Sequence, residues 1–266
     1  MSTILPVYVM CNEKYMTIFQ SLLYSLQQLN FDFSKLTIVD IGLCEDDKRF
    51  FKEHKIKVLE IPSWYKDGEH PCQFTRLNYD TLLPDNAFIS LDADVWLQDL
   101  ECLETLSNTA LRTGFAGVFA PRNYRKSPKY HNFLYELPKD LLQKNAFNTG
   151  VFAVNNFPSL FSYARFMWSH KREYSFGTEQ ACFELSLYYH KIFDSLPTTY
   201  NWLVDWFDDE QIEINNGKIF VNEQYIHIIH LLLKSKTKLF DIKVDGKYRR
   251  VLLLPKTINA VGAKNE

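Results

Sequence analysis

The chain is poor in cysteine, with only five among its 266 residues. They lie far apart and none forms a Cys-x-x-Cys pair; the five are Cys11, Cys44, Cys72, Cys102 and Cys182. An odd number at wide spacing argues against a disulfide framework and against a cysteine-based zinc site. The pattern is typical of a reducing compartment, so we expect a cytoplasmic protein whose cysteines are mostly small buried residues.

Long hydrophobic runs are also missing. No stretch approaches the roughly 18 apolar residues that a membrane-spanning helix needs. The first six residues lack the basic and apolar segments of a secretion signal. We therefore expect no membrane span, which leaves only peripheral association open. A large excess of one charge sign is missing too. The formal net charge is only −2, so the chain has no bulk electrostatic attraction to nucleic acid.

The chain does contain enough apolar sequence for a large core, since 46% of its residues are hydrophobic. Strand-like and helix-like segments alternate in the first half. The expected strands are residues 4–10, 36–41, 57–61 and 87–91, and the expected helices are residues 15–29, 45–54 and 74–83. This alternation predicts an α/β fold with a mostly parallel, Rossmann-like sheet and flanking helices. We expect a single domain over residues 1–257 and a flexible tail over residues 258–266.

The alternation loosens after residue 100. The segments expected there are strands at 114–120 and 150–155, helices at 158–170 and 178–189, and a hairpin of 239–244 with 247–254. A basic segment with several prolines, residues 121–146, has two interpretations. It is either a solvated insertion with a short helix, or a lid or acceptor-facing loop.

Two carboxylates follow one of the expected strands directly. The apolar run 87–91 leads into Asp92-Ala93-Asp94, so both acids come at the end of a strand, where open α/β sheets bind ligands. In an extended segment residues i and i+2 point the same way, so both carboxylates can face one cation. Oxygen ligands of this kind suit Mg²⁺ or Mn²⁺, which can in turn hold a diphosphate.

A histidine late in the chain is a candidate for a third ligand. Residues 226–230 form an expected strand with His227 and His230 three positions apart, so the two rings point to opposite faces. Only one of them can join the carboxylates. A neutral imidazole is a reasonable Mn²⁺ ligand beside two carboxylates.

Further segments stand around Asp92-Ala93-Asp94 in a recognisable order. They are the opening strand and loop 7–15, the helix with Arg76, the Asn148-Thr149-Gly150 segment, Glu179-Gln180, and His230 with Lys236 six residues later. In these motifs the sequence resembles the GT-A glycosyltransferases, most closely the retaining family 8, which includes glycogenin and bacterial lipopolysaccharide hexosyltransferases.

The resemblance implies how a donor would be bound. Residues 1–100 would hold the nucleotide sugar and residues 101–257 would form the acceptor side. The base and ribose of a UDP-hexose would lie at the opening loop, through Val9, Cys11, Asn12 and Tyr15. The diphosphate would be contacted by Arg76, Ala93 and Lys236. A Mn²⁺ or Mg²⁺ ion would be held by Asp92, Asp94 and His230.

The resemblance also implies catalytic roles. Asn148 would hydrogen-bond sugar hydroxyls, and Glu179 and Gln180 would lie beside the anomeric carbon. Retention would follow either front-face attack by the acceptor or a covalent intermediate on Glu179. An acidic cluster, residues 205–210, offers a base for inversion instead. The family usually has a glycine between the histidine and the lysine, where this chain has Leu231-Leu232-Leu233. Either Lys234 and Lys236 replace that phosphate contact or donor binding is weaker.

These features predict a hexosyltransferase that acts on a glycan or another hydroxyl acceptor in polysaccharide biosynthesis. Two other classes stay open, a sugar nucleotidyltransferase and a non-catalytic nucleotide- or carbohydrate-binding module. The first would need a glycine-rich loop after the opening strand, where Cys11-Asn12-Glu13 stands. A metal-dependent phosphohydrolase would need more histidine and aspartate ligands for two metals. The sequence does not indicate the oligomeric state.

Overall fold

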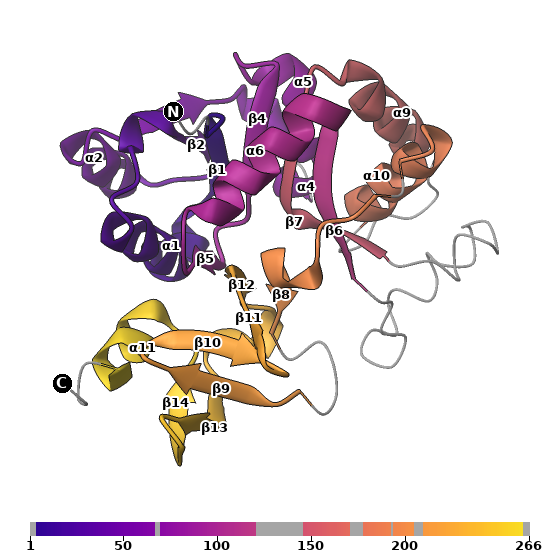
Figure 1. Cartoon of the computed structure of the whole chain (residues 1–266). Coiled ribbons are helices and arrows are strands. Elements are labelled where there is room, and N and C mark those ends of the chain that lie inside the picture. The colour runs from indigo at the N-terminus through magenta and orange to yellow at the C-terminus, as the bar shows by residue number, and fades with distance from the viewer. Residues whose placement is uncertain are drawn as a thin grey trace.

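A computed structural model describes residues 4–66, 70–120, 146–170, 178–192, 194–204 and 210–262. Its largest element is a six-stranded sheet in the order β3-β2-β1-β4-β7-β6 (Figure 1). The strands are β1 (Val7–Cys11), β2 (Leu36–Asp40), β3 (Lys57–Glu60), β4 (Ala87–Leu91), β6 (Phe115–Ala120) and β7 (Ala146–Asn155). The four neighbours from β3 to β4 are parallel, and only β7 runs against its neighbours. The mostly parallel sheet predicted from the sequence is confirmed.

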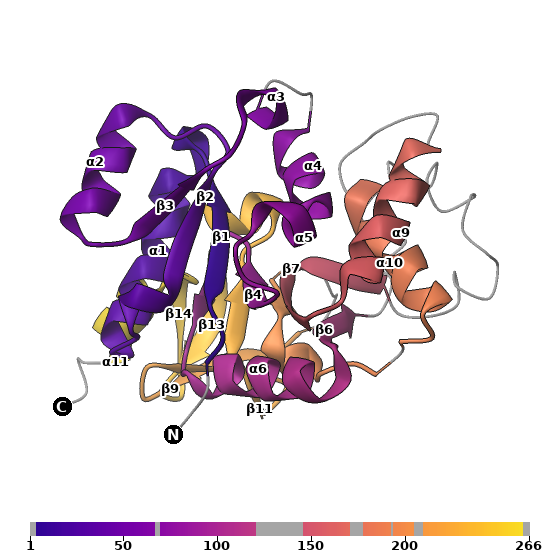
Figure 2. The same ribbon diagram turned by 90° about the horizontal axis from the view of Figure 1, so that it is seen from above.

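Helices cover both faces of this sheet (Figure 2). They are α1 (Met16–Gln28), α2 (Glu45–Glu53), α3 (Ser63–Lys66), α4 (Pro71–Leu77), α5 (Tyr79–Leu82), α6 (Glu101–Thr113), α9 (Pro158–Ser169) and α10 (Thr178–Tyr189). One further helix, α11 (Pro255–Gly262), packs against α1 and against the strands β9 (Ile212–Asn215) and β14 (Lys247–Leu252). Strand β1 shows why a layer of helices is needed on each face of the sheet, because successive side chains of a strand point to opposite faces. Val7 and Val9 pack in the core that includes α1 and α6, whereas Tyr8 and Met10 pack in the core that includes α9 and α10.

The second half adds two smaller sheets. A three-stranded sheet has the order β5-β12-β8, with β5 (Val95–Leu97), β12 (Ile228–His230) and β8 (Trp202–Leu203). A five-stranded sheet has the order β11-β10-β9-β13-β14, with β9 (Ile212–Asn215), β10 (Lys218–Val221), β11 (Gln224–Tyr225), β13 (Leu239–Val244) and β14 (Lys247–Leu252). A third core joins them through Trp96, Trp202 and Ile229. The small sheets therefore carry segments from both halves of the chain.

Several sequence expectations need correction. The expected helix 74–83 is two short helices, α4 and α5, which meet at Asn78. The expected tail does not begin at residue 258, because Ile258 lies inside α11 and is fully buried in the third core. Pro255 starts this helix, and proline is favoured at a first helical position. The basic segment 121–145 lies outside the described residues. Within the described residues no helix is long and apolar enough to cross a membrane.

Candidate functional site

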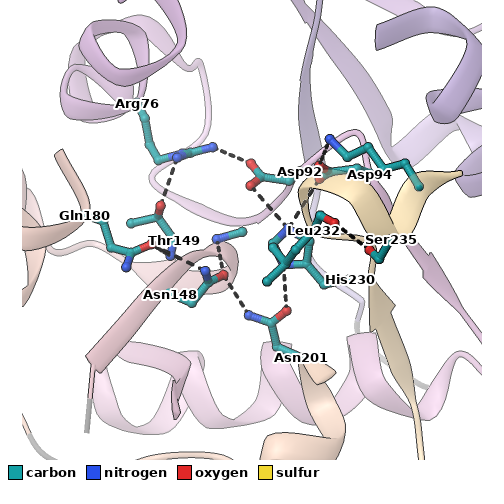
Figure 3. A network of polar contacts seen from close by, with 12 residues as sticks. Arg76, Asp92, Asp94, Asn148, Thr149, Gln180, Asn201, His230, Leu232 and Ser235 are labelled. Carbon is teal, nitrogen blue, oxygen red and sulfur yellow. Dashed lines mark hydrogen bonds and ion pairs between the residues drawn. The ribbon is translucent and has the colours of Figure 1, made fainter. Parts of the chain in front are cut away.

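Strand pairing brings the two aspartates and His230 together. Asp92 and Asp94 follow β4, and the chain continues directly into β5. Strand β12 pairs antiparallel with β5 and places His230 opposite Val95. The imidazole Nε2 of His230 then lies 3.3 Å from Asp94 Oδ1 and 3.9 Å from Asp92 Oδ2 (Figure 3). Ligand atoms of all three residues lie within 4.8 Å of one another.

The local geometry differs from the sequence argument in one respect. Asp92-Ala93-Asp94 forms a turn after β4 and not an extended segment. The carboxylates converge because the chain folds back, with the Val95 N–H 3.4 Å from the Asp92 carbonyl. This donor set of two carboxylates and one imidazole suits a divalent cation such as Mn²⁺. The residues therefore fit the metal that the resemblance implied.

Two protein cations lie against the carboxylates. Lys236 Nζ is 2.7 Å from Asp94 Oδ2, and the Arg76 guanidinium forms an ion pair with Asp92. Burial by itself would raise the pKa of Asp94, but His230 and Lys236 outweigh it and lower the pKa to about 2. The pKa of Asp92 is raised, because its burial and the neighbouring Asp94 outweigh Arg76. Asp94 is thus the more firmly ionised of the two acids.

Arg76 connects the aspartates to α10. It projects from α4 and is almost fully buried. Besides Asp92, its Nη1 donates to Glu179 Oε1 at 2.7 Å and to the Thr149 hydroxyl at 2.9 Å. Burial would lower the pKa of Arg76, but Asp92 and Glu179 outweigh it and raise it further. The guanidinium is therefore a buried cation that connects α4 with the turn after β4, with β7 and with α10.

Glu179 and Gln180 differ in what they face. Glu179 is 4% exposed, and one of its carboxylate oxygens, Oε1, accepts hydrogen bonds from Arg76 and Thr149. Its pKa is raised by burial, against the effect of Arg76. Gln180 is less buried, and its Oε1 lies 3.4 Å from the Asn148 side-chain nitrogen. Of the pair, Gln180 is better placed to meet a ligand, and Glu179 acts here as the partner of Arg76.

The opening loop reaches the site through Tyr15. Asn12 Oδ1 accepts the Tyr15 N–H at 3.2 Å and caps a 3₁₀ turn, η1 (Glu13–Tyr15). The Lys236 ammonium lies 4.6 Å from the centre of the Tyr15 ring, which is 41% exposed. The side chains of Val9, Cys11 and Ala93, in contrast, are part of the hydrophobic core. A ligand could meet those three residues only through their backbone.

A short 3₁₀ turn, η4 (Leu233–Lys236), returns Lys236 to the site. Its turn is closed by the Ser235 N–H, which donates to the Leu232 carbonyl at 2.8 Å. Of the two lysines expected near the phosphates, the structure describes only the side chain of Lys236. In the acidic cluster at 205–210 only Glu210 is described, and it accepts a hydrogen bond from the Trp202 indole at 2.8 Å.

His227 takes a different position from His230, as its place on the strand predicts. Its Nδ1 lies 2.9 Å from Asp99, and its ring stacks on Tyr200 with 4.4 Å between the centroids. Asp99 also accepts the Cys102 N–H at the start of α6. Asp99, Glu101 and His227 form a second group of ligand-type side chains. Because Asp99 already accepts hydrogen bonds from the helix start and from His227, we interpret this group as a structural junction.

Sequence reasoning missed Asn201. It follows a 3₁₀ turn, η3 (Thr198–Tyr200), and its amide lies between His230 and Asn148. No spacing motif marks it, because its partners come from distant parts of the chain. The only signal in the sequence is a polar residue directly before the apolar Trp202-Leu203 pair of β8.

Gly150 is required by the imidazole. A Cβ on this residue would lie 2.3 Å from His230 Cε1 and 2.8 Å from its Nδ1. Gly150→Ala is therefore expected to displace the ring and to cost about 1–3 kcal/mol of folding stability, as overpacking usually does. Mn²⁺ affinity, measured by electron paramagnetic resonance, should fall together with the melting temperature.

Gly117→Ala is the matched control for that variant. Its Cβ would lie 2.7 Å from the Phe147 ring and 2.9 Å from the Phe115 ring, inside the hydrophobic core. It should cost comparable stability and leave Mn²⁺ affinity unchanged. Equal loss of Mn²⁺ affinity in both variants would contradict the specific role of the Gly150–His230 contact.

No protein-family model matches the sequence, and no curated protein matches it. Solved structures do match. An active-site mutant of LgtC aligns with a TM-score of 0.57 at 12% identity, over 84% of this chain and 86% of that one. Mouse xyloside xylosyltransferase 1 aligns at 0.54 and 14% identity, over 85% and 96%. GlyE of Streptococcus pneumoniae TIGR4 aligns at 0.54 and 13%, over 88% of this chain and 55% of that one. At these identities the likeness concerns the fold, and this chain has the GT-A fold of glycosyltransferases.

Proposed function

We propose that this protein is a metal-dependent hexosyltransferase that uses a nucleoside-diphosphate sugar, UDP-linked, and transfers the sugar with retention to a glycan or another hydroxyl acceptor. The observation that carries the proposal is the convergence of Asp92, Asp94 and His230, with Lys236 and Arg76 beside them. This set lies in a GT-A fold, and one matching structure is LgtC galactosyltransferase in complex with donor and acceptor sugar analogues.

Each part of the site has a task in such a transfer. When bound, a divalent cation supplies Lewis-acid neutralisation of the departing diphosphate. Lys236, on its flexible stem, can turn from Asp94 to a phosphate oxygen and add a second positive charge. Asn148 and Gln180 offer amide groups to the sugar and to the positive charge that develops at its anomeric carbon. Glu179 keeps Arg76 in place, which supports front-face attack over a covalent intermediate on Glu179.

The charges at the site predict that metal and nucleotide bind together. Asp92, Asp94 and Glu179 face only two cations, Arg76 and Lys236, and Arg76 is shared between Asp92 and Glu179. A divalent ion alone would leave a positive excess in a partly buried site, and a diphosphate alone would meet the two carboxylates. Mn²⁺ or UDP alone should thus raise the melting temperature little, and both together by more than the sum. Joint binding at 100 times the dissociation constant stabilises by about 2.7 kcal/mol.

Differential scanning fluorimetry with a panel of nucleoside diphosphates, with and without Mn²⁺, measures this. Mg²⁺ in place of Mn²⁺, and GDP and ADP in place of UDP, test the choice of ion and base. If no nucleotide shifts the melting temperature with either ion, the proposed function is wrong. A full shift with Mn²⁺ alone would contradict the charge argument but not the metal site. Hydrolysis of a UDP-hexose with Mn²⁺ then separates an enzyme from a non-catalytic binding module.

Cytoplasmic location and a role in polysaccharide biosynthesis are part of the same proposal. The nucleotide sugar and the glycan acceptor are its partners. Donor hydrolysis screens identify the sugar.

A further inference from the structure

Asn201 is held between the imidazole and the strand that carries Asn148. It is 1% exposed and directly precedes β8, which pairs in parallel with β12, the strand of His230. Its Oδ1 lies 3.0 Å from His230 Nδ1, and its Nδ2 lies 3.0 Å from Asn148 Oδ1 (Figure 3). A buried amide with partners on both sides has one stable orientation.

That orientation can be worked out from a backbone donor. The Gly150 N–H can only donate, and it lies 2.9 Å from the Asn148 side-chain oxygen. That atom must therefore be an acceptor, so the atom of Asn201 facing it must be the NH₂ group. The oxygen of Asn201 then faces His230 Nδ1, which must carry a proton to donate to it.

A second backbone donor supports the same assignment. The Thr149 N–H lies 3.5 Å from Gln180 Oε1, so that atom is an acceptor too. It faces the Asn148 NH₂ group at 3.4 Å, which agrees with the orientation already derived for Asn148. These hydrogen bonds form a relay from the β7 backbone through Asn148 and Asn201 to the imidazole of His230. Each donor and each acceptor in this relay is assigned.

We propose that Asn201 is a positioning residue that holds a proton of His230 on Nδ1, so that Nε2 is the ring nitrogen left to bind a cation beside Asp92 and Asp94. This inference rests on the proposed metal site and goes beyond it, because it assigns a role to a residue outside the ligand set. The same amide holds the oxygen of Asn148. One side chain therefore sets the orientation of a metal ligand and of a donor-facing amide.

Outer hydrogen bonds of this kind typically change metal affinity by 10–100-fold when they are removed. Leucine at position 201 has the same branched arrangement of heavy atoms as asparagine, with bulkier methyl groups, but cannot accept the hydrogen bond from the imidazole N–H. Asn201→Leu is therefore expected to weaken Mn²⁺ binding by about 10–100-fold. Aspartate keeps an oxygen for Nδ1–H but presents a second oxygen to Asn148 Oδ1, which is itself an acceptor.

The first experiment measures the tautomer in the metal-free protein without any nucleotide. The protein is labelled with ¹⁵N-histidine, and the ring nitrogens are recorded at a pH about two units above the ordinary imidazole pKa of ~6.5. His230→Gln identifies the His230 signals among the seven histidines. The expected result is a protonated Nδ1 in the wild type and in Asn201→Asp, and its loss in Asn201→Leu. An Nδ1 without a proton in the wild type would overturn the proposal.

The second experiment measures Mn²⁺ affinity in the presence of UDP, and donor hydrolysis, for the same variants. Asn201→Leu should lose affinity, whereas Asn201→Asp should bind Mn²⁺ within a few-fold of wild type and lose kcat through Asn148. Loss of Mn²⁺ affinity to the same degree in both variants would show that position 201 acts only through folding. If the tautomer is as expected but neither Mn²⁺ nor UDP binds, the proposed function fails and the imidazole orientation still stands.

Gln98→Leu is the control for the loss of a buried amide. Gln98 is 3% exposed, and its amide donates to the Ile219 carbonyl and accepts the Ile219 N–H, outside the relay. It should lower the melting temperature without altering the His230 ring signals. If Gln98→Leu shifts the tautomer as Asn201→Leu does, the assignment to Asn201 is wrong.

Discussion

Asp94→Asn is expected to reduce Mn²⁺-dependent donor hydrolysis by on the order of 10³-fold, because a catalytic metal contributes several kcal/mol and each ~1.4 kcal/mol is a factor of ten. Asparagine keeps the shape of the side chain but removes the negative charge that faces His230 and Lys236. Because the pKa of Asp94 is lowered, its charge also stabilises the folded state, so the free energy of unfolding is measured beside the activity. Turnover of UDP-hexose and Mn²⁺ titration by electron paramagnetic resonance measure the effect.

Asp94 is the sharper test of the metal than Asp92. Removing the charge of Asp92 would also take a partner from the buried Arg76, so loss of activity there could reflect a disturbed fold. Asp241→Asn is the control, because Asp241 lies in an exposed pair with Arg250 away from the site. Exposed pairs contribute little. Full Mn²⁺-dependent turnover in Asp94→Asn would remove the aspartate pair from the proposed mechanism.

Arg76→Met is expected to destabilise the fold by about 3–5 kcal/mol, the usual effect of removing one partner from a buried ion pair. Methionine fills much of the space but leaves the Glu179 carboxylate buried without its cation. Chemical denaturation of the metal-free protein measures the free energy of unfolding. Donor hydrolysis should fall as well, because Asp92 loses its partner and the diphosphate a nearby positive charge.

The double variant Arg76→Met/Glu179→Gln distinguishes charge from packing. Neutralising Glu179 removes the unpaired buried charge, so the double variant should be more stable than Arg76→Met alone. Arg165→Met is the matched control, because Arg165 pairs with Asp80 at a position where the arginine side chain is 29% exposed. Arg165→Met should lower the free energy of unfolding clearly less than Arg76→Met does. Equal losses for both arginines would show that Arg76 is not a specially buried cation.

Local sequence patterns predicted most of the large sheet and its helices. β1, β2, β3, β4 and β7 carry unbroken apolar runs or β-branched residues, and the expected helices match α1, α2, α9 and α10 closely. The short strands β8–β11 were missed. Strands of two to four residues are too short for a clear alternation. β8 forms because it pairs with β12. β9 pairs with β13, β10 pairs with β9, and β11 pairs with β10, and a local pattern does not show these pairings.

Motif order predicted which side chains converge, and long-range packing decided their neighbours. The Asp92, Asp94 and His230 group follows from the resemblance. Two details needed coordinates. One is that the carboxylates meet through a turn, and the other is that Glu179 is the partner of Arg76. Asn201 was invisible for the same reason, since its amide joins β7 to β12 across the fold and belongs to no motif.

The pairing of β5 with β12 has a consequence during synthesis of the chain. The carboxylates leave the ribosome long before His230, and the imidazole reaches them only after β12 has added to the edge of β5. Such distant pairing forms late because long loops must close first. A nascent or truncated chain that lacks β12 therefore has Asp92 and Asp94 without the imidazole of His230. Affinity for a divalent cation then reports whether β12 has paired with β5.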